Sequence, residues 1–247
     1  MGQRLAASAP SPSHHRSTMP PAMQSIILIR HGYVQSWDDR PKGRGSPPHL
    51  RIDPALAELG RRQAALGATR IASADAVLCS PFRSCLETAD LIAATTKAAV
   101  TADWKLGEIL ISSVLGIPYS PTMGMDPDWA ERRAGAGKPS HPESDRTVQE
   151  RVAKTVNELK ARKPFAGRLV IVSHDTVLKA LVAAMTGRTV TLDWHPCGLA
   201  TLVRAKPVDR QWRVTGLLGD VSHLGADDRC EPAEDIVVKY HPNDSRS

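Results

Sequence analysis

Residues 25–32 read SIILIRHG, an apolar run of four residues that ends in arginine, histidine and glycine. An unbroken apolar run rich in β-branched side chains predicts a strand that is buried on both faces of a sheet. Arg30 and His31 follow at its carboxyl end, and Gly32 lets the backbone come close to a ligand. The stretch therefore predicts a central strand with reactive side chains directly after it.

Strands and helices alternate along the rest of the chain. Helical spacing of apolar residues predicts helices over residues 56–72, 82–94, 145–162 and 176–185. Short apolar runs predict strands over residues 75–79, 168–173, 198–204 and 211–217. This alternation indicates an α/β fold with three layers, in which a mainly parallel sheet carries helices on both faces.

Residues 25–224 form the predicted domain, and three segments depart from its alternation. Residues 1–24 are rich in Ser, Pro, Ala and His and contain no acidic residue, which predicts a disordered leader; a mitochondrial transit peptide is the alternative. Residues 109–142 are rich in Pro, Gly and Met and have no regular period, so we expect an irregular insertion over the pocket. Residues 225–247 form a C-terminal tail.

The composition narrows the classes of function. In 247 residues no apolar run approaches the ~18 residues of a membrane span, so we expect no membrane partner. The formal charge of +6 favours anionic ligands, yet Lys and Arg are dispersed and aromatic residues are few, so nucleic acid is not expected as a partner. The four cysteines have no metal-ligand spacing, which favours reduced thiols and a cytoplasmic location over a mitochondrial or nuclear one.

Two histidines stand where predicted parallel strands end. Ligands of open α/β sheets bind beyond the carboxyl ends of the strands, and His31 and His174 both lie there. His174 also precedes a helix, whose N-terminus favours an anion. We expect the two imidazoles to lie on opposite sides of one anion-sized site, with Arg30 beside them. Glu108, in the loop after Trp104, is the candidate general acid.

Several segments together resemble the histidine phosphatase superfamily, which has a phosphoglycerate mutase-like fold. The resemblance covers roughly residues 25–224, with the insertion matching least. Its segments are IILIRHG (26–32), DPALAELGRRQA (53–64), DAVLCSPFRSCLETA (75–89), VSHDTVLKAL (172–181) and WRVTGLLGDVSHL (212–224).

The resemblance implies a phosphatase that works through a phosphohistidine. His31 would attack phosphorus, while Arg30 and His174 hold the equatorial oxygens of the phosphoryl group. Glu108 would protonate the leaving oxygen and then take a proton from the hydrolytic water. The implied partner is a phosphorylated small molecule or phosphoprotein, and neither a metal nor a cofactor is required.

Within the superfamily the chain is most similar to a branch with an RHGY motif, a following tryptophan and an SPF–C–ETA motif. That branch includes the phosphatase domains of ubiquitin-associated, SH3-containing regulators of tyrosine-kinase signalling. It also includes the phosphatase-like subunit of an RNA polymerase III transcription factor. The corresponding residues here are 30–33, Trp37 and 80–89.

One motif departs from the family's pattern. The resemblance implies an arginine four residues before Thr88, and this position is Ser84. Arg83 stands one residue early. Neighbouring side chains on a helix diverge by ~100°, so Arg83 binds phosphate only if its long side chain bends into the pocket.

Two hypotheses of function follow from these motifs. The first is an active phosphatase, favoured by the retained Arg30, His31, Glu108 and His174. The second is a weakened or silent phosphatase-like domain that serves as a binding or assembly module, favoured by the missing arginine. Asp175 leaves a similar choice, since it either caps the following helix or faces the pocket and repels phosphate.

Overall fold

The computed structural model describes residues 24–35, 52–109, 113–114, 117–118, 125–137, 142–161, 167–204 and 211–230. Its strands of four or more residues are β1 (Gln24–Arg30), β2 (Ala76–Cys79), β3 (Ala99–Ala102), β6 (Arg168–Ser173), β7 (Leu199–Arg204) and β8 (Arg213–Asp220). Its α-helices with named bounds are α3 (Glu58–Ile71), α4 (Arg83–Thr96), α6 (Asp145–Ala161) and α7 (Asp175–Thr186). The predicted leader up to residue 23, and residues 231–247 of the tail, lie outside the described residues.

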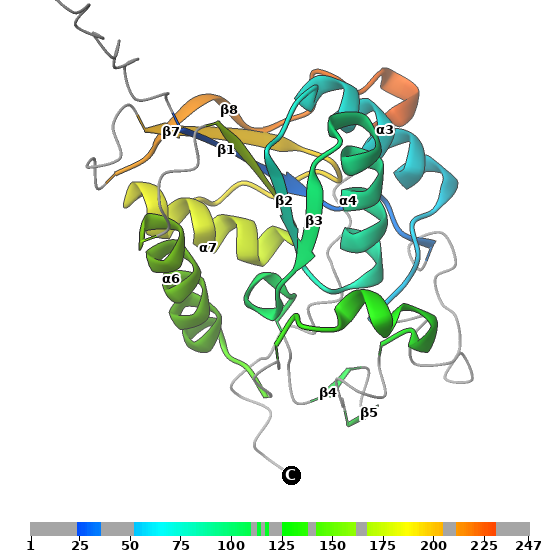
Figure 1. Ribbon diagram of the computed structural model, residues 1–247, viewed down its shortest axis with the longest axis horizontal. Coiled ribbons are helices and arrows are strands. Elements are labelled where there is room, and N and C mark those ends of the chain that lie inside the picture. Colours follow the sequence, from blue (N-terminus) through cyan, green and yellow to red (C-terminus); the bar gives the residue numbers. More distant parts are fainter. Residues whose placement is uncertain are drawn as a thin grey trace, which may run out of the picture.

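The strands form one six-stranded sheet in the order β3-β2-β6-β1-β7-β8 (Figure 1). Neighbours from β3 to β1 pair in parallel, whereas β7 is antiparallel to both β1 and β8. The predicted α/β fold with a mainly parallel sheet is thereby confirmed. The apolar strand β1 lies inside this sheet, between β6 and β7.

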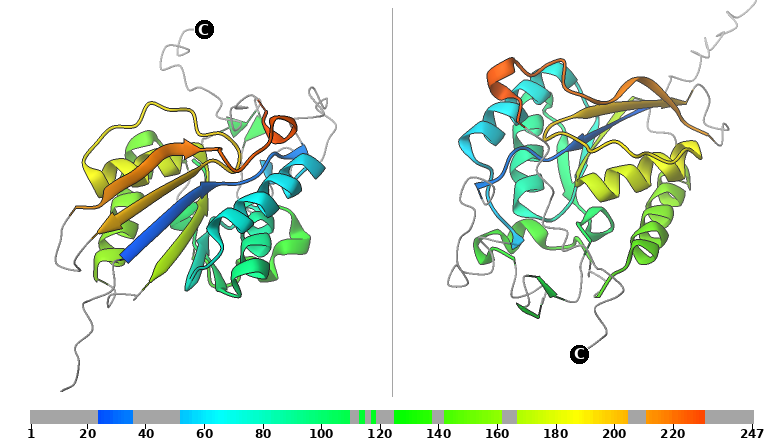
Figure 2. Two further views of the ribbon diagram at one scale, coloured as in Figure 1. Left: turned by 90° about the horizontal axis from the view of Figure 1, so that it is seen from above. Right: turned by 180° about the vertical axis from the view of Figure 1, so that it is seen from behind.

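Helices cover the sheet on both faces, with the pair α3–α4 on one side and the pair α6–α7 on the other (Figures 1 and 2). Alternate residues of β1 pack into the two hydrophobic cores, one on each face of the sheet. Ile26 and Leu28 are fully buried in the core that contains α6 and α7, while Ile27 and Ile29 belong to the core that contains α3 and α4. Each such side chain contributes about 1.5–3 kcal/mol when fully buried, so the central strand is held from both faces.

The structure differs from the prediction at two boundaries and in one additional strand. Gln24, placed in the leader, begins β1, and its buried side chain accepts a hydrogen bond from Arg204. Strand β3 was not predicted, because AVTA at the sheet edge exposes alternate residues and lacks an apolar run. Residues 225–230, placed in the tail, lie against α3, where Asp228 pairs with Arg62 at 3.2 Å.

Residues 125–137 of the insertion lie at the edge of the sheet where the parallel strands end. They contain the 3-10 helices η2 (Pro127–Trp129) and η3 (Glu131–Arg133). Arg133 donates to the carbonyl of Pro81 after β2, and the carbonyl of Ala136 accepts from the backbone of Trp104 after β3. A hairpin of β4 (Ser113–Val114) and β5 (Ile117–Pro118) also falls within the predicted irregular segment.

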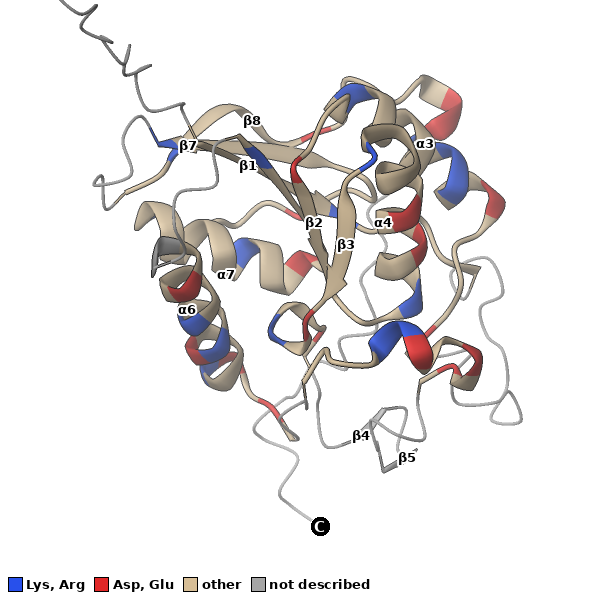
Figure 3. Cartoon of the chain, viewed as in Figure 1, with Lys and Arg blue, Asp and Glu red and all other residues tan. Residues whose placement is uncertain are grey.

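Charged residues of both signs are interspersed along the elements, for example on α6 and around η2 and η3 (Figure 3). On α6, Arg146 pairs with Glu150 one turn later. Within the described ranges no helix is long and apolar enough to cross a membrane.

Candidate active site

The register of β1 and β6 brings the two histidines together. It pairs Arg30 with Ser173, the last residues of the two strands. The next residue of each strand is a histidine, and the backbone N–H of His31 donates to the Ser173 carbonyl at 3.1 Å. The rings of His31 and His174 then meet edge to face, with centroids 5.1 Å apart and planes at 63°. Two imidazoles at this separation can contact one phosphoryl group.

The loop after β1 orients the imidazole of His31. Its Nδ1 lies 2.8 Å from the carbonyl oxygen of Gly32, which only accepts, so Nδ1 carries the proton. In the neutral ring the lone pair is therefore on Nε2. A Cβ added at Gly32 would lie 2.5 Å from the Gly60 carbonyl oxygen, so only glycine lets the loop rest on α3. The Gly32 N–H also donates to Thr88 Oγ1 on α4.

His174 lies between a hydroxyl and a carboxylate. Its Nε2 is 2.8 Å from Ser80 Oγ, and its Nδ1 is 3.6 Å from Glu108 Oε2. Ser80 Oγ accepts from the Phe82 N–H at 3.3 Å and keeps both a second lone pair and its own proton, so it can accept from or donate to His174 Nε2. The Nδ1 side of the ring faces Glu108. The structure thus places Glu108 beside the second histidine.

Ser80 is a site residue that the sequence analysis did not identify. It directly follows β2, and its N–H donates to the carbonyl of Val172 on the neighbouring strand β6. The carboxyl ends of parallel neighbours share one edge of a sheet, so its position after the strand was the available signal. Before a proline, however, a serine is also an ordinary loop residue.

Glu108 is held from two directions. Its Oε1 accepts from the N–H of Ile109 at 2.8 Å, and its backbone carbonyl accepts from Arg151 on α6 at 3.3 Å. Arg151 is itself fixed by Glu143, with Nε and Oε1 2.7 Å apart. The glutamate side chain is 13% exposed, so it is largely buried beside His174. Its role as the general acid stays a prediction.

Arg30 is buried beneath the site and donates from Nη1 to the carbonyl of Trp194. The Trp194 N–H donates to Asp175 Oδ1 at 2.8 Å. Asp175 also pairs with Lys179 at 2.6 Å and is the first residue of α7, so the interpretation of Asp175 as the helix cap is wrong. The capping position belongs to His174, without a side-chain bond. Lys179 offsets the carboxylate charge near the predicted phosphate position.

Arg83 points toward the insertion. Its Nε lies 2.7 Å from Glu87, its Nη1 lies 2.5 Å from Asp126, and its guanidinium is 5.3 Å from the ring centre of Trp129. Arg83 and Glu87 lie one turn apart on the same face of α4. This arrangement argues against Arg83 as a phosphate ligand, and that role stays an untested prediction.

Ser84 lies on a different face of α4. It is 4% exposed, and its carbonyl accepts from Thr88, the residue one turn later that also contacts the Gly32 N–H. Positions 84 and 88 therefore share the helix face that touches the His31 loop. A guanidinium at position 84 would start from that face, whereas one at position 83 does not.

A buried ionic cluster joins the insertion to the start of α4. The carboxylate of Asp53 accepts from the side chain of Arg133 and from the backbone N–H groups of Arg83 and Asp126. Burial raises the pKa of Asp53 and lowers the pKa of Arg133. Desolvation thus works against the pair, and its hydrogen bonds compensate. Asp53, which comes from a distant segment, also places its negative charge at the N-terminus of α4, where the helix dipole favours it.

Three cysteines lie buried in the layer next to the site. Cys85 Sγ is 3.5 Å from His174 Nε2, and burial raises the pKa of Cys79 to about 12. Burial likewise raises the pKa of Cys197. The thiols of Cys79 and Cys197 therefore stay protonated and serve as packing groups. In the part of the chain that the structure describes, no group of three or more His, Cys, Asp or Glu is arranged to hold a metal ion.

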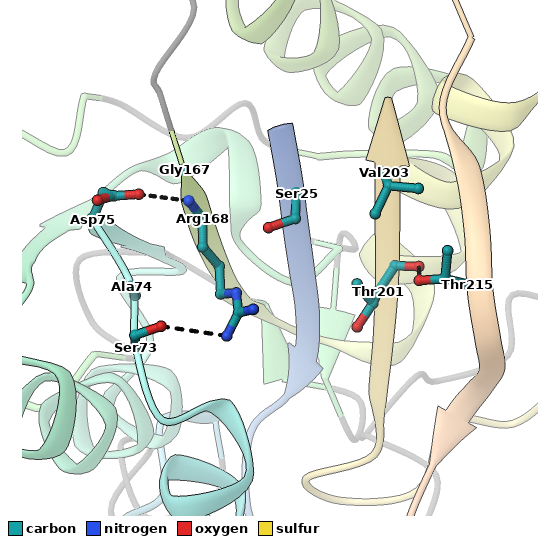
Figure 4. A pocket seen from close by; sticks show the side chains of 9 residues that line it. All are labelled: Ser25, Ser73, Ala74, Asp75, Gly167, Arg168, Thr201, Val203 and Thr215. Atoms are coloured by element: carbon teal, nitrogen blue, oxygen red, sulfur yellow. Dashed lines mark hydrogen bonds between the residues drawn. The ribbon is translucent and has the colours of Figure 1, made fainter. Parts of the chain in front are cut away.

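A cavity of about 590 Å³ lies where the parallel strands β1, β2 and β6 begin, at the edge of the sheet opposite to the histidines (Figure 4). Its lining is mostly hydroxyl-bearing or charged: Ser25, Ser73, Ala74, Asp75, Gly167, Arg168, Thr201, Val203 and Thr215. Asp75 and Ser73 accept from Arg168, which closes one side of it. This cavity is separate from the histidines.

The fold and site together define an α/β protein with a pair of histidines at the carboxyl edge of its sheet. The chain belongs to the histidine phosphatase superfamily, because the family model for branch 1 of that superfamily matches residues 26–218. No curated protein sequence matches the chain.

Solved structures with the same fold are remote in sequence. A mycobacterial hydrolase is 22% identical, with a TM-score of 0.59, and the match covers 83% of this chain and 94% of that one. A mycobacterial glucosyl-3-phosphoglycerate phosphatase is 23% identical, with a TM-score of 0.55 and coverage of 78% and 97%. A phosphoserine phosphatase from Entamoeba histolytica is 21% identical, with a TM-score of 0.54 and coverage of 81% and 99%. These similarities show the shared fold.

Proposed function

We propose that the protein is a phosphatase that hydrolyses phosphoric monoesters through a phosphohistidine on His31. One observation carries the proposal: the Gly32 carbonyl holds the proton of His31 on Nδ1, so the lone pair of the neutral ring is on Nε2, and the ring lies 5.1 Å from that of a second histidine. A nucleophile that is oriented by a backbone acceptor needs no separate base to remove a proton.

The reaction takes two steps. Nε2 of His31 attacks phosphorus, the ester P–O bond breaks, and protonated Glu108 gives its proton to the leaving oxygen. A water molecule then attacks phosphorus, the P–N bond breaks, and Glu108 takes the proton of the water. His31 is regenerated, and inorganic phosphate leaves. Arg30 and His174 stabilise the charge on the equatorial oxygens in both steps.

We place the substrate among small phosphate monoesters. Solved structures with this fold include a glucosyl-3-phosphoglycerate phosphatase and a phosphoserine phosphatase. The comparisons do not support the predicted membership of the branch with tyrosine-kinase regulators and the transcription-factor subunit. A cytoplasmic location stays a prediction.

The test is turnover of para-nitrophenyl phosphate by the wild type beside His31→Ala. We expect turnover by the wild type and its loss in the variant, with equal circular dichroism of the two proteins. Rapid acid-free quenching with radiolabelled substrate should trap an acid-labile phosphoryl group on the wild type alone. Turnover that survives in His31→Ala would overturn the assignment of the nucleophile.

A silent binding module is the second candidate, and Ser84 is the observation that favours it. Losing one preorganised donor to transition-state charge costs about 2.7–4 kcal/mol, or ~10²–10³ in rate. Arg83 is engaged by Glu87 and Asp126 and is poorly placed to compensate. A wild type that neither turns over aryl phosphates nor binds inorganic phosphate would make this reading the leading one.

A further inference from the structure

Four rings lie in series from the proposed nucleophile His31 to the indole of Trp104. The centroid separations are 5.1 Å from His31 to His174, 5.2 Å from His174 to Phe82, and 5.9 Å from Phe82 to Trp104. All three contacts are edge to face, the geometry that aromatic pairs prefer. Trp104, at the end of the series, is partly exposed.

Two aliphatic side chains widen this series into an apolar wall. Ile52 and Met125 pack with Trp104 around Phe82, and all three are partly exposed while Phe82 is buried. We use the name aromatic wall for Ile52, Phe82, Trp104 and Met125. Met125 comes from the insertion, so the insertion contributes to the surface beside the site.

The aromatic wall lies on the leaving-group side of the site. In-line displacement puts the leaving oxygen opposite the attacking atom, and the general acid must reach that oxygen. Glu108 occupies that role in the proposed function, and Trp104 is in the same loop, within η1 (Trp104–Leu106). The loop turns tightly on the indole, because a Cβ added at Gly107 would lie 3.2 Å from the Trp104 ring.

Among the residues that the structure describes, the cations around the aromatic wall are paired with carboxylates of the chain itself. Arg83 pairs with Glu87 and Asp126, and Arg133 pairs with Asp53. A second anionic group on a substrate would therefore have to compete with these carboxylates for each arginine.

The same holds for the loop that carries the general acid. Arg151 pairs with Glu143 at 2.7 Å, and Lys105 pairs with Glu158 at 2.6 Å. In the described segments, the leaving-group side thus combines apolar surface with positive charge that is already paired. An apolar group gains from leaving water there, whereas an additional anion loses its hydration and has to compete with these carboxylates.

We infer that this site, taken as the phosphatase site proposed above, selects monoesters whose leaving alcohol is aromatic and carries no second anionic group. Trp104 and Met125 are its specificity-determining residues. The leaving ring packs against the aromatic wall while Glu108 protonates its oxygen, and a carboxylate on that ring is rejected.

The test compares three esters that differ in one property at a time. Phenyl phosphate and 3-carboxyphenyl phosphate differ in charge, and 1-naphthyl phosphate adds apolar area. We expect kcat/KM for the wild type to fall about 10-fold or more from phenyl to carboxyphenyl phosphate, and to rise from phenyl to naphthyl phosphate. Trp104→Ala should lower kcat/KM for naphthyl phosphate about 10-fold while inhibition by inorganic phosphate stays the same.

Leu217→Ala is the control, because Leu217 on β8 is 73% exposed and lies outside the aromatic wall. It should leave the ratio of naphthyl to phenyl turnover unchanged. Met125→Lys is a second variant, and its result does not depend on whether the Trp104→Ala protein folds. It should raise kcat/KM for the carboxyphenyl ester relative to the phenyl ester.

The outcomes separate this inference from the proposed function. No turnover of any ester, together with no binding of inorganic phosphate, would remove the proposed function itself. Turnover that favours the carboxyphenyl ester, or that ignores Trp104→Ala and Met125→Lys, would overturn the selectivity while the phosphatase remained. An effect of Leu217→Ala equal to that of Trp104→Ala would also overturn it.

Discussion

Ser84→Arg is the substitution that should change activity most. Ser84 shares a face of α4 with Thr88, whose hydroxyl accepts from the Gly32 N–H at 3.2 Å, beside the nucleophile. An arginine from this face can donate two parallel N–H bonds to a phosphoryl oxygen, which a serine cannot do. The existing Arg83 is already paired with Glu87 and Asp126 and starts from another face.

Two free-energy changes of opposite sign decide how Ser84→Arg affects turnover. A restored donor to transition-state charge is worth about 2.7–4 kcal/mol, or ~10²–10³ in rate. Ser84 is 4% exposed, so the larger side chain overpacks the start of α4 at a cost of about 1–3 kcal/mol of folding stability. A domain with about 5–15 kcal/mol of stability remains folded after that loss. Turnover should therefore rise although the protein unfolds more easily.

The assay measures kcat/KM for para-nitrophenyl phosphate, the inhibition constant of inorganic phosphate and the urea midpoint. Ser84→Met controls for bulk without charge and should lower stability without raising turnover. Arg83→Ala should lower stability by about 1–3 kcal/mol, because it leaves Asp126 without this partner, and phosphate affinity should stay the same.

Two results would refute this reasoning. If Ser84→Arg folds but gains neither phosphate affinity nor turnover, the His31 side of α4 is not a phosphate-binding face. If Arg83→Ala abolishes phosphate binding, Arg83 leaves Asp126 during catalysis and takes over the missing role.

Three further predictions concern single residues. Glu108→Gln should lose most activity toward alkyl phosphates and less toward para-nitrophenyl phosphate, whose leaving group needs little protonation; equal losses would show that Glu108 only shapes the loop. Ser80→Ala removes the partner 2.8 Å from His174 Nε2, so it should shift the pH profile of kcat, and an unchanged profile would argue against a positioning role. Burial lowers the pKa of His223 below its usual 6.5, so the unfolded chain takes up the proton first and stability should fall as pH drops through and below about 6.5. Urea midpoints at pH 7.5 and 5.5 should differ less in His223→Gln than in the wild type.

The histidine pair could be predicted from the sequence because local patterns and one topological rule were enough. The apolar runs before His31 and His174 indicate strands that are buried on both faces. The alternation with helices makes those strands parallel, and parallel strands end at one edge. The patterns did not predict that the two strands are direct neighbours, which the register of Arg30 with Ser173 shows.

The partners of Arg83 could not be predicted, because they depend on long-range packing. Asp126 lies 43 residues away, in a segment without any periodic pattern. Its position follows from Asp53 and Arg133, which join the insertion to α4 through buried hydrogen bonds. No local rule connects three segments that far apart, so the sequence left both orientations of Arg83 open.

The position of the arginine, 83 or 84, decides which groups the first turn of α4 contacts, although the net charge of the helix is the same in both cases. At position 84 a guanidinium would face the His31 loop and a phosphoryl group, while at position 83 it anchors the insertion through Asp126 and Trp129. The same first turn still contributes Cys85 to the surroundings of His174. The first turn of α4 thus helps to hold the segment that brings Met125 to the aromatic wall. In the proposed phosphatase, binding of the phosphoryl group then rests on Arg30 and His174, and the ester series measures how much discrimination comes from the leaving group.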